Sequence, residues 1–393
     1  MITFRKIVTI IFILNMTHLL LAEDNPLWVI DIKPPGKSGN QFSYLHELNK
    51  SGSGVRVYFS HENDILITFS RYAVPDNRKI KNAKKLKPTV FVALLINGET
   101  GNLIKRVEWS VDKSIASRYV YIHAFPEGGY LLRIGDNLQA LDSSLSVIRS
   151  RTLTPLPPEQ GYNTIMPRSG YYFVVDQNIN GKDRIYEIID WRTFETVEKM
   201  NASDFRIKDI WNDRLLGVGL NLSPMMRNTE NIYIGLLEKK IGDSSWNSFG
   251  HDLQRLRDAK FIYNGAIVVT CGIDYLFGPA FWLIMEDGKR SDPVYHGKND
   301  KERMGEIVPS AKSPVIAVGV FKLSDIRIFL DIGIVGTSWV DYWDVTTQQR
   351  LLQSKDEKDE IGGALSPDGR RLVVLKKKKL EMYAIPTTPA NEE

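Results

Sequence analysis

The segment DQNINGKDRIYE, residues 176–187, spaces oxygen-bearing side chains like the loop of a calcium site. It fits the pattern D-x-[DN]-x-[DN]-G-x5-E, in which carboxylate and amide oxygens surround the ion and a glycine permits the tight bend. Position eight of this pattern is apolar in helix–loop–helix calcium sites but is an aspartate here, which adds a candidate ligand. The predicted calcium ligands are Asp176, Asn178, Asn180, Asp183 and Glu187.

The same segment also has the pattern of a plain hairpin. It lies between the strand-like runs YYFVV and RIYEII, and not between helices. Asn180 and Gly181 form a dipeptide that favours the tight turn between two antiparallel strands. Calcium binding and a long hairpin turn therefore remain open as alternatives, and calcium is the only cofactor that the sequence suggests.

Lysine and arginine are concentrated in two segments, residues 71–89 and the tetralysine 376–379. Such clusters attract anionic partners, here an acidic polysaccharide, a lipid headgroup or an acidic protein surface. The alternative is a pair of solvated loops that keep the protein soluble. Nucleic acid is not expected, because the tetralysine has no interleaved aromatic residues and the formal charge of the chain is only +4. The candidate anion-binding residues are Arg78, Lys79, Lys81, Lys84, Lys85, Lys376, Lys377, Lys378 and Lys379.

The sequence contains no catalytic motif that we can assign. The 6 histidines are not spaced as zinc ligands, and the serine elbow G-x-S-x-G is absent. Cys271 is the single cysteine, so no intramolecular disulfide can form, and its apolar surroundings favour a buried structural role. Catalytic carboxylates in a ring of repeats come from separate repeats, so the spacing of acidic residues predicts no catalytic residue.

Residues 1–22 have the organisation of a secretory signal peptide. Two basic residues, Arg5 and Lys6, precede a mostly apolar run that ends near a small-residue cleavage point before Glu23. The run is short for a membrane span, which needs about 20 apolar residues. We therefore expect a secreted or periplasmic protein whose mature chain has no transmembrane span. The alternatives are an uncleaved anchor or lipid-facing tether and, last, a cytoplasmic chain.

One pattern recurs along the rest of the chain and predicts the elements that position these segments. It consists of a short strand, a tight turn rich in Asn, Asp, Gly, Pro and Ser, and a second apolar strand. The copies are about 40 to 65 residues apart, which is the range of a propeller blade. Seven copies occur, at residues 58–69, 123–134, 166–175, 209–219, 261–270, 309–319 and 364–375.

A second hairpin with a weaker outer strand follows most copies, as in residues 94–107 and 342–354. Each repeat then has four antiparallel strands, and such units repeated radially make a β-propeller. The seventh copy is followed by only one strand, LEMYAI, whereas LWVIDI at 27–32 has no partners near it in sequence. We expect LWVIDI to complete the seventh blade, because this closes the ring and removes both free edges. The predicted fold class is an all-β, seven-bladed β-propeller spanning residues 23–386, with a polar tail at 387–393.

The run SPDGRRLVVL, followed by LEMYAIP, resembles a blade of the WD-repeat-like propellers found in many bacterial exported proteins. The match is specific over this last repeat and diffuse over the others. The resemblance implies the propeller fold and a tendency to bind other molecules. It implies no catalytic residue.

Together these patterns indicate an exported, monomeric binding or interaction module whose partner is a protein or an anionic polysaccharide or surface. The alternative is a propeller enzyme, a hydrolase or lyase that acts on a polysaccharide with carboxylates at the central channel. A quinone-dependent dehydrogenase is disfavoured because no tryptophan docking motif recurs at the ends of the repeats. Clustered carboxylates or histidines at the channel mouth would favour the enzyme, and an apolar mouth would favour the binding module.

Overall fold

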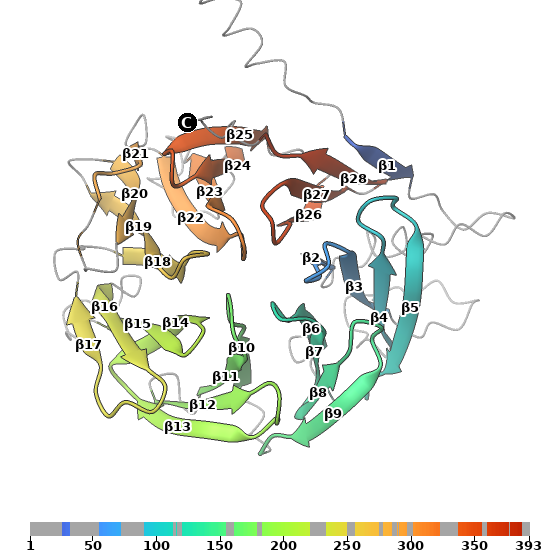
Figure 1. Ribbon diagram of the computed structural model, residues 1–393, viewed down its shortest axis with the longest axis horizontal. Helices are drawn as coiled ribbons and strands as arrows, with labels where there is room; N and C mark the ends of the chain where they lie inside the picture. The colour runs from blue at the N-terminus through green and yellow to red at the C-terminus, as the bar shows by residue number, and fades with distance from the viewer. Residues whose placement is uncertain are drawn as a thin grey trace, which may run out of the picture.

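The computed structural model describes residues 26–31, 55–71, 90–112, 115, 120–154, 161–178, 183–220, 233–249, 256–274, 278–284, 289, 291–296, 302–322, 337–355, 360–376 and 378–386. These ranges contain 28 strands and no helix, so they include no helix that could cross a membrane. The strands form seven antiparallel blades around a central axis (Figure 1). The predicted all-β, seven-bladed propeller is therefore confirmed. The predicted signal peptide and polar tail lie outside the described residues.

Each of the first three blades is a four-stranded meander whose first strand lies at the centre of the ring (Figure 1). Blade one contains β2 (Arg56–Phe59), β3 (Ile65–Arg71), β4 (Val90–Ile96) and β5 (Leu103–Ser110). Blade two contains β6 (Val120–Ala124), β7 (Tyr130–Ile134), β8 (Asn137–Leu141) and β9 (Val147–Thr152). Blade three contains β10 (Gly161–Ile165), β11 (Tyr172–Asn178), β12 (Arg184–Asp190) and β13 (Thr196–Ala202).

Blades four to six repeat the same order, and a single backbone pair, Tyr233 with Leu256, joins the sheets of blades four and five. Blade four contains β14 (Phe205–Trp211), β15 (Arg214–Leu220), β16 (Tyr233–Lys240) and β17 (Asn247–Phe249). Blade five contains β18 (Leu256–Phe261), β19 (Ile267–Asp274), β20 (Gly278–Ile284) and β21 (Tyr295–His296). Blade six contains β22 (Glu302–Pro309), β23 (Val315–Lys322), β24 (Thr337–Asp344) and β25 (Gln349–Lys355).

Blade seven combines the two ends of the described chain. Its first three strands are β26 (Glu360–Leu365), β27 (Arg371–Lys376) and β28 (Lys379–Ala384). The fourth is β1 (Trp28–Asp31), which pairs antiparallel with β28 and places Trp28 opposite Met382. The prediction that LWVIDI completes the last blade is therefore confirmed.

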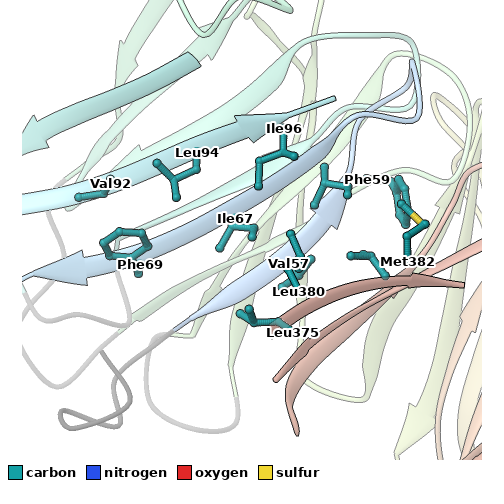
Figure 2. Packing of buried hydrophobic residues seen from close by; sticks show 12 residues of the cluster. Val57, Phe59, Ile67, Phe69, Val92, Leu94, Ile96, Leu375, Leu380 and Met382 are labelled. Atoms are coloured by element: carbon teal, nitrogen blue, oxygen red, sulfur yellow. The ribbon is translucent and has the colours of Figure 1, made fainter. Parts of the chain in front are cut away.

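The core consists of seven apolar clusters, one in each wedge between neighbouring blades. Side chains of a strand alternate between two faces, so each inner sheet supplies both of its neighbours. In β3, Ile67 and Phe69 face blade seven, whereas Leu66 faces blade two. Figure 2 shows the wedge between blades one and seven, where Val57 and Phe59 lie near Leu380 and Met382. Burial of these wedges holds the ring together without any disulfide.

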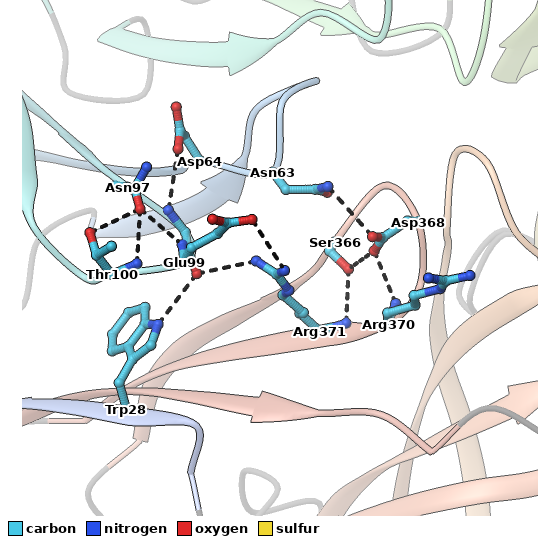
Figure 3. Close-up of polar contacts among 11 residues, drawn as sticks. Trp28, Asn63, Asp64, Asn97, Glu99, Thr100, Ser366, Asp368, Arg370 and Arg371 are labelled. Carbon is cyan, nitrogen blue, oxygen red and sulfur yellow. Dashed lines mark hydrogen bonds and ion pairs between the residues drawn. The ribbon is translucent and has the colours of Figure 1, made fainter.

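A polar seam joins blades one and seven at the end of the ring where their hairpin turns lie (Figure 3). The carbonyl oxygen of Gly98 accepts hydrogen bonds from Trp28 Nε1 at 3.3 Å and from Arg371 Nη1 at 3.4 Å. Asn63 Nδ2 donates to Asp368 Oδ2 at 3.5 Å. The strand from the N-terminal end thus contacts the first blade as well as the last.

The SPDG turn of blade seven has a structural role. The Ser366 hydroxyl accepts a hydrogen bond from the Arg371 backbone N–H at 2.9 Å and donates to Asp368 Oδ1 at 2.6 Å. Gly369 has a φ of +71°, and a Cβ there would lie 2.1 Å from Ser313 Oγ of blade six. The glycine therefore satisfies both a left-handed backbone and a close contact between blades.

Candidate functional site

The first strands of all seven blades surround a central channel with a volume of about 790 Å³. Its mouth lies at the end of the ring formed by the turns between first and second strands, which we call the turn face (residues 60–64, 125–129, 167–171, 212–213, 262–266, 310–314 and 366–370). A cavity of this size matches sites that enclose small organic ligands. The channel is therefore the candidate functional site.

Hydrogen bonds around the mouth connect every pair of neighbouring blades. Each bond joins two first strands or the turns that follow them, which fixes the shape of the opening. In order around the ring, these contacts are His61 with Pro126 O, Gly170 N with Glu127, Arg168 N with Ile210 O, Phe261 N with Asp209, Ile307 N with Asp258, Ser310 with Pro367 O, and Asn63 with Asp368.

His61 also contacts blade six across the mouth, because Lys312 Nζ lies 3.4 Å from its Nε2. A lysine ammonium can only donate, so Nε2 is the acceptor and Nδ1 donates to the Pro126 carbonyl oxygen. These two contacts orient the histidine ring at the edge of the opening.

Among the described residues, the charged side chains of the channel lining come from blades three, four and five. Five are cationic and three are acidic, so this wall carries an excess of positive charge. The cations are Arg168, Arg184, Arg206, Lys208 and Lys260, and the acids are Asp176, Asp209 and Asp258. We call this group the cationic wall.

Two of the three acids are used to connect blades. Asp209 is buried; its Oδ2 accepts from Arg168 Nε at 3.3 Å and from the Phe261 N–H at 2.9 Å. Asp258 Oδ2 accepts from the Ile307 N–H at 3.2 Å. In β14 and β18, each of these aspartates directly follows an extra residue that shifts the strand register. The bulges point these carboxylates at the next blade.

The third acid, Asp176, forms an ion pair with Arg184 on the neighbouring strand. Burial raises the pKa of Asp176, although the positive charges of Arg184 and Arg206 oppose this shift. The Oδ1 atom of Asp176 has no hydrogen-bond partner among the described residues, and neither has Nε of Arg184. This pair thus keeps an unused acceptor and an unused donor.

Aromatic side chains of blades one and two form another part of the lining. The His123 ring lies 5.5 Å from the Tyr58 ring and 4.9 Å from the Tyr121 ring, measured between centroids. Burial lowers the pKa of His123 to about 4, with a smaller contribution from the positive charge of Arg56. The imidazole is therefore neutral near pH 7, and this wall is aromatic and uncharged.

The described side chains that blades six and seven supply to the channel are mainly apolar, among them Ile307, Val308 and Leu365. Val308 stays 44% exposed although its side chain is apolar. The lining is thus divided into a cationic, an aromatic and an apolar part. Such a division suits a ligand with an anionic group and a less polar body.

Two of the residues predicted to bind calcium lie on opposite faces of one hairpin. Asp176 pairs in register with Tyr186 and Glu187 with Val175, so Asp176 and Glu187 project from opposite faces of the β11–β12 hairpin. Glu187 binds Arg151 and Thr196, and Asn178 and Asp183 lie at the hairpin ends. Asn180 lies outside the described residues, and the calcium site remains a prediction. Among the described side chains, no three of His, Cys, Asp or Glu are grouped to hold a metal.

Two of the predicted anion-binding lysines of blade seven lie next to a buried acid, Glu381. Lys376 Nζ lies 2.8 Å from Glu381 Oε2, and Lys379 Nζ lies 3.8 Å from Glu381 Oε1. Lys378 is exposed. The remaining predicted residues, namely Arg78, Lys79, Lys81, Lys84, Lys85 and Lys377, lie outside the described residues. The structure therefore leaves this patch a prediction, with part of its charge neutralised by Glu381.

Sequence reasoning missed the cationic wall. Its residues are dispersed between 168 and 260 and converge only because the first strands meet at the axis. One signal was available in the sequence. At the repeats 209–219 and 261–270, a charged residue, Asp209 or Lys260, stands shortly before the turn, whereas the other repeats mostly have an apolar or aromatic residue there.

No protein-family description and no curated protein matches this sequence. Among solved structures, the chain is similar to the β-propeller domain of the Trilobed protease from Pyrococcus furiosus (10% identity, TM-score 0.54, covering 86% of this chain and 98% of that chain). It is similar to a chain of the mitotic checkpoint complex (10%, 0.50, 93% of each chain) and to the Pan2 WD40 domain of Neurospora crassa (9%, 0.47, 94% and 97%).

At these identities the similarities show the fold alone, a β-propeller, and the strand order of this chain gives it seven blades. The Trilobed protease domain is described as having an open velcro topology. In this chain, β1 closes the last blade. Similar propellers therefore differ in how the ring is closed.

Proposed function

We propose that this protein is a binding module that takes an anionic ligand, or an anionic group of a larger partner, into the central channel. The observation that carries this proposal is the cationic wall, where five cations and three acids among the described residues line one cavity of about 790 Å³. Low-dielectric walls strengthen the field of such a group and raise the local concentration of anions.

A binding role is favoured over catalysis by the state of the channel carboxylates. General acid–base chemistry needs a carboxyl group that is positioned toward substrate and able to exchange a proton. Asp209 and Asp258 accept backbone hydrogen bonds that join blades, and Asp176 is paired with Arg184. Asp209 and Asp258 thus already connect blades, and the charge of Asp176 is balanced by Arg184, which supports binding over a hydrolase or lyase.

The proposal is tested by titrating citrate, a compact polyanion, into the protein by calorimetry. Lys260→Met removes one charge from the cationic wall, and Lys378→Met removes one exposed charge from blade seven. We expect Lys260→Met to weaken citrate binding roughly five- to tenfold, about 1 to 1.4 kcal/mol, and Lys378→Met to leave it unchanged. Binding should also weaken as salt is added. Equal effects of the two substitutions, or none, would overturn the channel as the anion site.

A further inference from the structure

The ion pair between Asp176 and Arg184 is incomplete although it is buried in the channel wall. Arg184 Nη1 binds Oδ2 of Asp176, while Asp176 Oδ1 and Arg184 Nε have no partner among the described residues. The Asp176 side chain is only 6% exposed. A buried carboxylate oxygen without a donor is uncommon, because it loses hydration and gains nothing in return. Both atoms are themselves buried, so a ligand reaches them only when the pair turns toward the channel; the pair holds one unused acceptor and one unused donor.

Few chemical groups satisfy both atoms. A carboxylate or phosphate can only accept, so it serves Arg184 alone, and an ammonium can only donate, so it serves Asp176 alone. A hydroxyl both donates and accepts, and adjacent hydroxyls of a sugar ring can bind the two atoms together. The pair therefore favours a polyhydroxylated ligand.

The aromatic part of the lining agrees with this choice. Tyr58 and His123 line the same cavity as Asp176 and Arg184. The face of an aromatic ring is electron-rich and attracts the weakly positive C–H groups on the face of a sugar. A carboxamide would also satisfy Asp176 and Arg184, but it has no such face.

We infer that the channel binds a sugar acid, with ring hydroxyls at Asp176 and Arg184 and the acid group at the other cations of the cationic wall. This inference rests on the proposed anion site and adds the hydroxyl subsite to it. Asp176 is then a specificity-determining residue, since a plain anion does not use it.

Three probes separate charge from hydroxyl recognition in calorimetric titrations: glucuronate, glucose and cyclohexanecarboxylate. Glucuronate carries both features, glucose has only the hydroxyls, and cyclohexanecarboxylate has only the ring and the charge. We expect glucuronate to bind about tenfold or more tightly than either of the others.

The Asp176→Asn variant gives opposite signs for the two explanations. If only charge matters, removing a negative charge strengthens the binding of every anion. If Asp176 accepts from a hydroxyl, the variant weakens glucuronate binding about tenfold and leaves cyclohexanecarboxylate binding unchanged or slightly stronger. Asp258→Asn is the matched control, because it removes a channel charge whose oxygen already accepts from Ile307, and it should not weaken glucuronate binding.

Arg184→Lys is a second variant if Asp176→Asn does not fold, because lysine keeps the positive charge and removes Nε. This variant should also weaken the binding of glucuronate but not that of cyclohexanecarboxylate. Glucuronate binding as tight in Asp176→Asn as in the parent would overturn the inference, as would equal binding of glucuronate and cyclohexanecarboxylate. Those results leave the anion site intact if citrate still responds to Lys260→Met. Loss of all anion binding would instead refute the proposed function.

Discussion

Closure of the ring can be tested at Gly98, whose carbonyl oxygen accepts hydrogen bonds from Trp28 and Arg371 of blade seven. A Cβ at this position would lie 1.9 Å from the backbone oxygen of Asn63 and 3.0 Å from its carbonyl carbon. Both are backbone atoms, so in Gly98→Ala either the turn at residues 60–64 or the turn between β4 and β5, which carries Gly98, must move. Overpacking of this kind costs about 1 to 3 kcal/mol.

The movement also affects the seam. The Gly98 carbonyl accepts from Trp28 and Arg371, and its N–H donates to Asp64 Oδ1 at 3.2 Å. If two of these bonds are lost, at roughly 0.5 to 1.5 kcal/mol each, the total destabilisation is about 2 to 6 kcal/mol. At about 2 °C per kcal/mol for a large domain, Tm should fall by roughly 4 to 12 °C.

The assay is differential scanning calorimetry at one fixed scan rate, because a chain of this length can unfold irreversibly. Gly128→Ala is the control: Gly128 has a φ of +105° but a Cβ there meets nothing within 4 Å, so it tests backbone strain without a clash. Gly98→Ala should lower Tm more than Gly128→Ala does. A Tm for Gly98→Ala equal to that of the parent would refute the role assigned to this seam.

Two further predictions concern the closing strand and the channel histidine. Removal of residues 23–31 exposes the edge of β28 and should lower Tm for the whole propeller and promote association, as measured by calorimetry and size-exclusion chromatography; an unchanged transition would contradict closure by β1. Burial lowers the pKa of His123 to about 4, whereas the ordinary histidine pKa is about 6.5. The unfolded chain therefore binds this proton more readily than the folded chain does. Folding stability is consequently lost as pH falls from about 6.5 toward 4. His123→Gln should reduce this loss in Tm measurements between these pH values, whereas parallel curves for parent and variant would show that another group is responsible.

The blade pattern was predictable because it depends on local chemistry. Turn residues such as those of SPDG set the hairpins, and alternating apolar residues such as Leu66 and Ile67 require two buried faces. Two buried faces per sheet are satisfied when each blade packs between two others, as the seven clusters show. The pairing of β1 with β28 also followed from the sequence. The last repeat lacks a fourth strand and the first strand lacks a partner, so pairing them removes both free edges.

The site depended on tertiary structure. The sequence drew attention to DQNINGKDRIYE and the lysine clusters, where the relevant residues are neighbours in the chain. The strand register, however, places Asp176 and Glu187 on opposite faces of one hairpin, and Lys376 forms an ion pair with the buried Glu381. The cationic wall instead combines residues that are up to 92 positions apart in sequence, from Arg168 to Lys260. Sequence by itself determined the blades, because turn and burial preferences act over a few residues; only the closed ring decided which charges share the channel, because that depends on how seven sheets converge on one axis.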